Sequence, residues 1–332
     1  MKELLKLNQS RRNIIFETTA REMKVTPVVI EKDFWVCVVL DYLLNKSQYK
    51  DCFIFKGGTS LSKCYHVIER FSEDLDIVLK WDVLGYNDEL VYKDRSKNQN
   101  YLFETKMNEK GARFIQNEIK SDLLESLASD IPGLNIKSDD NDPMVLYVEY
   151  PHSASNHYIN SVVKLEIGPM AAKTPMEHKQ VSPYYVNYFD FKDDDKEFDA
   201  SVVSIARTFY EKLLILYSET NRPIEKKMPT HYFRHYYDVA MIYQSEYYAD
   251  IIKQKELFEE VRLFKNKYYR TYWSKIEGCS LSTIRIYPPK HRIRDLRNDY
   301  EQMKEMFFGE IPSFEEVLSL IASLEKELRA NG

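Results

Sequence analysis

The pattern of hydrophobic positions changes character part-way along the chain. Up to about residue 195, short apolar runs of strand length alternate with helical stretches, and beyond it the pattern is helical almost to the end. The predicted strands are Phe53–Phe55, Ser72–Leu79, Val145–Tyr150, Val162–Ile167 and Val181–Phe191. The predicted helices are Val28–Leu44, Leu61–Glu69, Phe103–Leu127, Val202–Tyr217 and one that starts near Pro229. This pattern predicts an α/β (α+β) lobe over residues 1–195 and an α-helical lobe over residues 196–332, with a charged loop, Asp193–Lys196, as the boundary.

A glycine turn follows the first predicted strand. Gly57, Gly58, Thr59 and Ser60 come directly after the apolar run, and two adjacent glycines are conspicuous in a chain that has only nine. Because glycine lacks a Cβ, its backbone can pass close to a phosphate. The turn is therefore predicted to hold an anionic group.

The next predicted strand carries two acids two residues apart. Asp74 and Asp76 project from one face of the strand, whereas Leu75, Ile77 and Leu79 point to the other. Their Cα atoms would be roughly 7 Å apart, a spacing at which both carboxylates can ligate divalent cations. The turn and the strand together predict a Mg–nucleotide site. The alternative is that the two aspartates form only the solvated face of a half-buried strand.

Two further charged residues stand out in the predicted helical lobe. Lys212 lies about 60° from Phe209, at the flank of a buried stripe, so it is predicted to point into a cleft that supplies anionic groups. Arg207 and Glu211 fall on the opposite face and are interpreted as ordinary surface charge. Asp238 has Arg234 four residues before it, an arrangement that suits either an active site or a salt bridge between helices.

These motifs together resemble a known family. GGTSL (57–61) with RFSEDLD (70–76), EKDFWV (31–36), RTFYEK (207–212) and RHYYD (234–238) resemble the AbiEii toxin family. Its members are nucleotidyltransferase-like toxins of type IV toxin–antitoxin and abortive infection systems, which act in phage defence. The resemblance spans nearly the whole chain. It implies a bilobal nucleotidyltransferase fold, with a mixed-sheet N-terminal lobe, a helical C-terminal lobe and the active site in the cleft between them.

The resemblance also implies roles for individual residues. Asp74 and Asp76 would hold Mg²⁺ (or Mn²⁺), while the glycine turn and Ser72 would bind phosphate oxygens of a nucleoside triphosphate. Lys212 would neutralise the triphosphate, and Asp238 would act as a base or orient the acceptor. In the superfamily a third acid on a neighbouring strand commonly completes the metal cluster. Glu166, on the strand Val162–Ile167, is the candidate here, although a plain surface position fits this residue about as well.

The implied reaction is nucleotidyl transfer with release of pyrophosphate. The family suggests the 3′ end of tRNA as the acceptor, a modification that would stop translation, and an antitoxin that restrains the enzyme. One alternative acceptor is a protein hydroxyl or a small molecule. A different alternative is a non-catalytic, nucleotide-binding regulatory module that has kept the fold.

The charge is distributed unevenly along the chain. The net charge is −5, yet Val261–Arg297 has ten Lys and Arg against two acids, so the rest of the chain carries −13. This basic segment also contains Tyr268, Tyr269, Tyr272, Trp273 and Tyr287. Cations beside rings that can stack on bases are typical of RNA binding, but solvated cations and core tyrosines would give the same composition.

Composition also sets expectations about the compartment. No apolar run approaches the 18 or so residues of a membrane span, and Met1–Leu7 lacks the apolar core of a signal peptide. The four cysteines show no CxxC spacing and are interpreted as buried small residues without chemistry. A cytoplasmic protein with no membrane partner is expected.

Overall fold

A computed structural model describes residues 1–72, 74–151, 162–192 and 196–332. Residues 193–195, most of the loop predicted to separate the lobes, lie outside the described residues. The chain packs as two compact units. The first comprises Met1–Cys64 and Phe71–Val203, and the second comprises Tyr65–Arg70 and Ser204–Gly332. A catalytic role for the N-terminal lobe and a closing role for the C-terminal lobe stay predictions.

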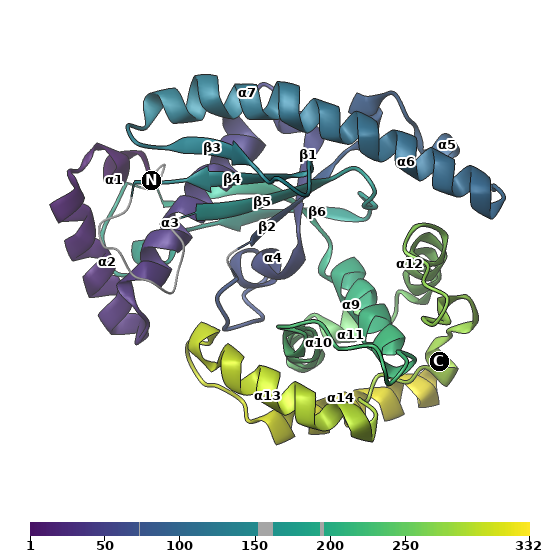
Figure 1. The fold of residues 1–332 in the computed structure, drawn as a ribbon. Coiled ribbons are helices and arrows are strands. Elements are labelled where there is room, and N and C mark those ends of the chain that lie inside the picture. The colour runs from purple at the N-terminus through teal and green to yellow at the C-terminus, as the bar shows by residue number, and fades with distance from the viewer. Residues whose placement is uncertain (73, 152–161, 193–195) are drawn as a thin grey trace. The chain divides into compact units, whose positions relative to one another are not determined.

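The first unit is built on a mixed sheet (Figure 1). Among the described residues the sheet has seven strands in the order β3-β4-β5-β2-β1-β7-β6. The β2–β5 and β1–β7 pairs are parallel, and the other pairs are antiparallel. The strands are β1 (Phe53–Lys56), β2 (Asp74–Leu79), β3 (Asn135–Ser138), β4 (Val145–Glu149), β5 (Val162–Gly168), β6 (Met176–Val181) and β7 (Phe198–Val203). The mixed α/β class predicted from the sequence is confirmed.

Helix α3 forms much of the core of the first unit. It begins at Pro27, whose fixed φ suits a first helical position, and every residue from Val29 to Asp41 is buried. The nearly unbroken apolar run therefore serves a helix covered on all sides. The other helices of this unit are α1 (Lys2–Lys6), α2 (Gln9–Met23), α4 (Gly57–Lys63), α5 (Asp88–Tyr92), α6 (Lys97–Phe114) and α7 (Lys120–Asp122). Figure 1 shows α6 and α7 as one long helix, joined by a π-helical turn.

The second unit is helical, as the pattern predicts. Its helices are α9 (Ile205–Thr220), α10 (Phe233–Gln244), α11 (Tyr248–Ile251), α12 (Lys255–Tyr268), α13 (Ile293–Met303) and α14 (Phe314–Asn331). Helix α10 packs against α9, α13 and α14, and α12 packs against α9 (Figure 1). Across the described residues of both units, no helix is long and apolar enough to cross a membrane.

Two predicted elements are wrong. The helix predicted over Leu61–Glu69 ends at Lys63, because the chain leaves the first unit at Tyr65 and packs in the second. The strand predicted over Val181–Phe191 instead precedes that range, since Met176–Val181 pairs with β7 and the chain then reaches Pro183, which donates no ladder hydrogen bond. In the first case tertiary packing outweighs local helix propensity, and in the second a proline ends the strand.

Two predicted helix starts are shifted. Val202 belongs to β7, and α9 starts after Ser204, whose hydroxyl accepts the Arg207 N–H at 3.2 Å. Helix α10 starts at Phe233 instead of near Pro229. The Asp299 carboxylate of α13 accepts the N–H of His231 at 2.6 Å and that of Phe233 at 2.7 Å, and so caps the helix from outside.

Candidate active site

The predicted glycine turn, Gly57–Ser60, is not a separate turn before a helix from Leu61: it is the beginning of α4, which starts at Gly57, and it lies against the acidic strand in the first unit. Gly57 follows β1 with φ +84°, and a Cβ at this position would lie 2.0 Å from Oδ2 of Asp76. Both the backbone conformation and the close approach therefore require glycine. A second contact joins the same two segments, because the Thr59 hydroxyl donates to the Asp74 carbonyl at 2.6 Å.

The hydroxyls of the turn are already used within the fold. Thr59 and Ser60 are buried, and the Ser60 hydroxyl donates to the Gly57 carbonyl at 2.8 Å. Gly58 is half-buried, as is Ser72, which lies just before β2. In this arrangement the main chain of the turn is better placed to meet an anion than its two hydroxyls are. Phosphate binding by these residues stays a prediction.

The predicted carboxylates lie on one face of the sheet. In the register of the sheet Asp76 is opposite Glu166 on β5, and Asp74 is opposite Lys164. Asp74, Asp76 and Glu166 are partly exposed, whereas Leu75, Leu165 and Ile167, which point to the other face, are buried. The alternation predicted for both strands is therefore present.

Glu166, the predicted third acid, is already paired with a lysine. The Lys164 ammonium is ion-paired with Glu166, and this hydrogen bond, together with the nearby Asp74 charge, raises the pKa of Lys164 despite partial burial. Glu166 would have to leave this lysine before it could bind a metal. Among the described residues, no group of three or more Asp, Glu, His or Cys side chains is arranged to hold a metal ion.

The remaining donor set nevertheless fits a divalent cation. Asp74 and Asp76 supply hard carboxylate oxygens from adjacent same-face positions, which Mg²⁺ and Mn²⁺ accept. The missing Cβ of Gly57 lets the main chain pass directly against Asp76 Oδ2, so the backbone and this carboxylate lie side by side. A metal held by this pair, with Glu166 as a third ligand, stays a prediction.

The second unit brings Lys212 and Asp238 together. Lys212 Nζ lies 2.8 Å from Asp238 Oδ2, and Asp238 is fully buried. Arg70 binds the same carboxylate with two nearly equal contacts, Nε to Oδ1 and a terminal nitrogen to Oδ2, each 2.8 Å. Arg234, which shares a face with Asp238, forms no ion pair within the described part of the chain. The structure therefore shows two cations facing one carboxylate.

Charge dominates over burial at Asp238. Burial alone would raise its pKa, but the charges and hydrogen bonds of Arg70 and Lys212 outweigh it and hold the pKa well below the usual aspartate range. Burial and nearby cations also act on His235, one turn away from Asp238. Burial first, and then Lys212 and Arg234, hold the pKa of His235 well below its usual value, so its imidazole is neutral.

Sequence reasoning missed Arg70. The residue sits in the RFSEDLD string, so a signal was present, but its partner lies 168 positions away. A second error concerns Arg207, which was interpreted as surface charge. Arg207 does pair with Glu211 at 3.1 Å, yet it is buried, with its guanidinium over the Phe264 ring of α12.

A second buried ion pair joins the helix that begins with the glycines, α4, to the core helix α3. Lys63, the last residue of α4, lies 2.6 Å from Asp33 of α3, and both side chains are almost fully buried. The Asp33 carboxylate also accepts the Tyr184 N–H at 2.8 Å, and Lys63 Nζ sits 3.8 Å from the centroid of the Tyr184 ring. These contacts tie the end of α4 to the core helix. The EKDFWV string contains Asp33, but sequence reasoning assigned it no role.

Comparison with known proteins places these features in a family. The model of the family described as "Nucleotidyl transferase AbiEii toxin, Type IV TA system" matches residues 38–320. MenT4, a nucleotidyltransferase toxin from Mycobacterium tuberculosis H37Rv, has a similar fold, with a TM-score of 0.51 and 16% identity over 96% of this chain and 94% of that one. JHP933 from Helicobacter pylori matches with a TM-score of 0.43 and 14% identity, over 92% and 94%.

A search of curated protein sequences found no match. The family match, however, covers most of the chain, including both aspartates of β2, Lys212 and Asp238. The order of strand, glycine turn and acidic strand described above is part of the matched region. The chain therefore belongs to the AbiEii family of nucleotidyltransferase toxins from type IV toxin–antitoxin systems.

Proposed function

We propose that this nucleotidyltransferase transfers a nucleoside monophosphate from an NTP to the 3′ end of tRNA and thereby blocks translation. The observation that carries the proposal is the contact between the glycine turn and Asp76. Because Gly57 has no Cβ, the main chain that would meet a phosphate packs directly beside a partly exposed pair of same-face aspartates, which would supply oxygen ligands for a cation.

Asp74 and Asp76 would hold Mg²⁺ or Mn²⁺ in this proposal. Such an ion offsets the charge that develops on the entering and leaving oxygens during an in-line displacement at phosphorus. The main chain of Gly57 and Gly58 and the Ser72 hydroxyl would contact phosphate oxygens. Glu166 would join the cation only in a state in which Lys164 has released it.

Lys212 would bind the triphosphate without giving up Asp238. Its ammonium has three hydrogens, of which the Asp238 contact needs one, so two remain for phosphate oxygens. Asp238 is a weak base, because Arg70 and Lys212 depress its pKa. We therefore assign Asp238 the task of orienting Lys212 and give it no proton to remove.

The reaction forms one bond and breaks another at the α-phosphorus. A hydroxyl oxygen of the acceptor attacks in line and its proton passes to solvent, while the bond from phosphorus to the bridging oxygen breaks and releases pyrophosphate. The basic segment Val261–Arg297 supports an RNA acceptor over a protein hydroxyl or a small molecule. A toxin of this kind would need a cognate antitoxin as a partner.

The test is transfer from each α-labelled NTP, in the presence of Mg²⁺, to total tRNA. We expect label in tRNA with the wild-type protein and at least a hundredfold less with Asp76→Asn or Lys212→Ala. Asp140→Asn and Lys253→Ala alter exposed residues and serve as matched controls that keep the activity. Label on protein would overturn the acceptor, and no transfer despite NTP binding would favour the regulatory module.

A further inference from the structure

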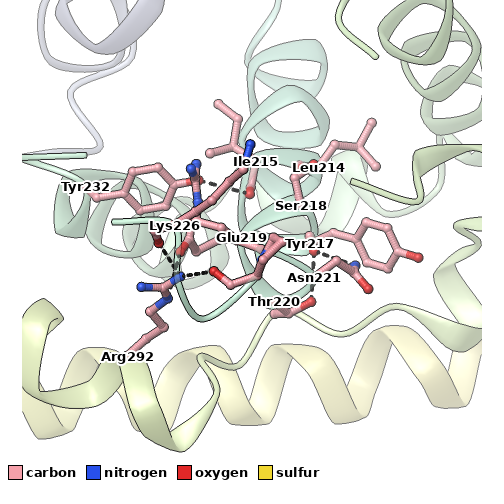
Figure 2. Close-up of polar contacts among 12 residues, drawn as sticks. Leu214, Ile215, Tyr217, Ser218, Glu219, Thr220, Asn221, Lys226, Tyr232 and Arg292 are labelled. Atoms are coloured by element: carbon pink, nitrogen blue, oxygen red, sulfur yellow. Dashed lines mark hydrogen bonds and ion pairs between the residues drawn. The ribbon is translucent and has the colours of Figure 1, made fainter. Parts of the chain in front are cut away.

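The basic segment is wrapped around the C-terminal end of α9. The Tyr217 hydroxyl donates to the Lys275 carbonyl at 3.3 Å, and the Thr220 hydroxyl donates to the Arg285 carbonyl at 3.2 Å. Figure 2 shows this end of α9, with Tyr217 and Thr220 near Asn221. Two parts of the segment ten residues apart are therefore held within one turn of the same helix.

A buried acid fixes the loop that follows α9. Glu219 is fully buried and pairs with Arg222 at 2.6 Å. It also pairs with Arg292 at 3.4 Å (Figure 2). Arg292 also donates to the carbonyl of Pro223 at 2.8 Å and to that of Lys226 at 2.7 Å. The main chain at Lys226 is thus held in place by a buried charge network, although the Lys226 side chain is exposed.

An exposed ring lies beside this loop. Tyr272 is 79% exposed, the highest fraction of any large hydrophobic side chain among the described residues. Lys226 Nζ lies 5.0 Å from the centroid of its ring, and Arg222 lies 4.5 Å from that of the neighbouring Trp273. This region therefore presents an exposed aromatic face with a cation beside it, the two kinds of group that contact bases and phosphates in RNA-binding proteins.

Some cations of the basic segment form ion pairs in the structure, and others are exposed and could contact a partner. Four of its arginines are bound to carboxylates, in the pairs Arg262–Glu259, Arg270–Glu277, Arg292–Glu219 and Arg297–Glu315. Lys275, Arg285 and Lys290 are exposed and form no ion pair within the described residues. Lys226 and Lys227, in the loop after α9, are also exposed and also form no ion pair within the described residues. The acid Glu225 precedes them in the sequence.

We propose that these residues form an RNA-binding surface, which we call the α9-end surface. It comprises Lys226, Lys227, Tyr272, Lys275, Arg285 and Lys290. The cations would contact the sugar–phosphate backbone and an unpaired base would stack on Tyr272. A protein partner fits less well, because the centre of a protein interface is depleted in lysine. The inference rests on the proposed function, since it names where the acceptor RNA would dock.

The test measures binding of labelled total tRNA in the absence of NTP and divalent metal, so that it is independent of transfer. Tyr272→Ala is expected to weaken binding about fivefold or more, the low end for a lost base stack, while Tyr272→Trp keeps the affinity. The double variant Arg285→Gln/Lys290→Gln should reduce the slope of log K against log salt by about 2, one for each phosphate contact. Tyr101→Ala and Lys106→Gln change exposed residues of α6 in the first unit and should bind tRNA as the wild type does.

The outcomes separate this surface from the proposed reaction. If the wild type binds tRNA and Tyr272→Ala weakens binding, the surface stands even when no nucleotide is transferred. If tRNA is labelled but the Tyr272 and Arg285/Lys290 variants bind as the control variants do, the surface is wrong and the proposed function is untouched. Absence of any tRNA binding by the wild type also overturns the surface. Thermal melting of each variant checks that the fold is intact.

Discussion

Arg70 and Asp238 form a bidentate ion pair within the second unit, with both contacts at 2.8 Å and both side chains buried. A bidentate guanidinium–carboxylate pair fixes orientation as well as charge. The Asp238 carboxylate that binds Lys212 is therefore also bound and oriented by Arg70. This geometry makes Arg70 a positioning residue for Lys212 and Asp238.

Removal of Arg70 is predicted to cost stability and activity to different extents. Arg70→Met leaves Asp238 buried with one cation and should lower the free energy of unfolding by about 3–5 kcal/mol. Arg70→Lys keeps the charge but loses the two-point contact, so it should fold better yet still show a raised KM for NTP. Chemical denaturation and transfer kinetics measure the two effects. Equal kinetics for Arg70→Lys and wild type would contradict the positioning role.

Gly57→Ala is predicted to abolish activity through contact with Asp76. The added Cβ would lie 2.0 Å from Oδ2, so the carboxylate must move. Gly85→Ala is the matched control, because Gly85 has nearly the same φ, +81°, but its Cβ would meet nothing within 4 Å. Both variants should lose about 1 kcal/mol to backbone strain. Only Gly57→Ala should lose NTP-dependent transfer, and similar losses in both would refute the contact argument.

The buried pair Asp33–Lys63 is predicted to be essential only as a pair. Asp33→Leu leaves Lys63 buried and uncompensated and should destabilise the fold by about 3–5 kcal/mol. The double variant Asp33→Leu/Lys63→Met removes both charges and should recover most of that loss. A double-mutant cycle in denaturant measures the coupling. Additive single effects would show that the two side chains do not interact.

His235 predicts a pH dependence of stability. Its pKa is lowered in the folded state, so the unfolded chain binds a proton that the folded chain does not. Stability is then fully present above the ordinary histidine pKa of about 6.5 and falls as the pH drops below it, by at most about 1.4 kcal/mol per pH unit. Denaturant unfolding between pH 8 and pH 5 should show this slope in the wild type. His235→Gln should lack it.

Local patterns predicted the placement of the candidate residues in the first unit. The apolar run of β1, the glycines of the turn and the alternation along β2 are short-range features, and the register that sets Asp76 opposite Glu166 follows once the strands pair. The ion pair of Glu166 with Lys164 was missed because alternation gives a face but no partner.

The arrangement of the candidate residues in the second unit depended on contacts between distant residues. Helical period placed Lys212 near the buried side of α9, but its partner Asp238 comes from α10, and Arg70 binds that carboxylate from a third segment. Arg207 shows the same limit. Its helical face was predicted, but nothing local indicated that α12 would cover it and bury the guanidinium.

The path of the chain through the two units has a consequence for dissecting the molecule. Tyr65–Arg70 belongs to the second unit although the residues on both sides of it belong to the first, so neither unit is one continuous piece of sequence. A fragment that begins at Ser204 would contain Lys212 and Asp238 but would lack Arg70. In such a fragment Asp238 would be buried with one of its two cations, Lys212, and without the other. Cleavage after Val203 followed by separation of the pieces should therefore inactivate the enzyme, whichever piece binds nucleotide.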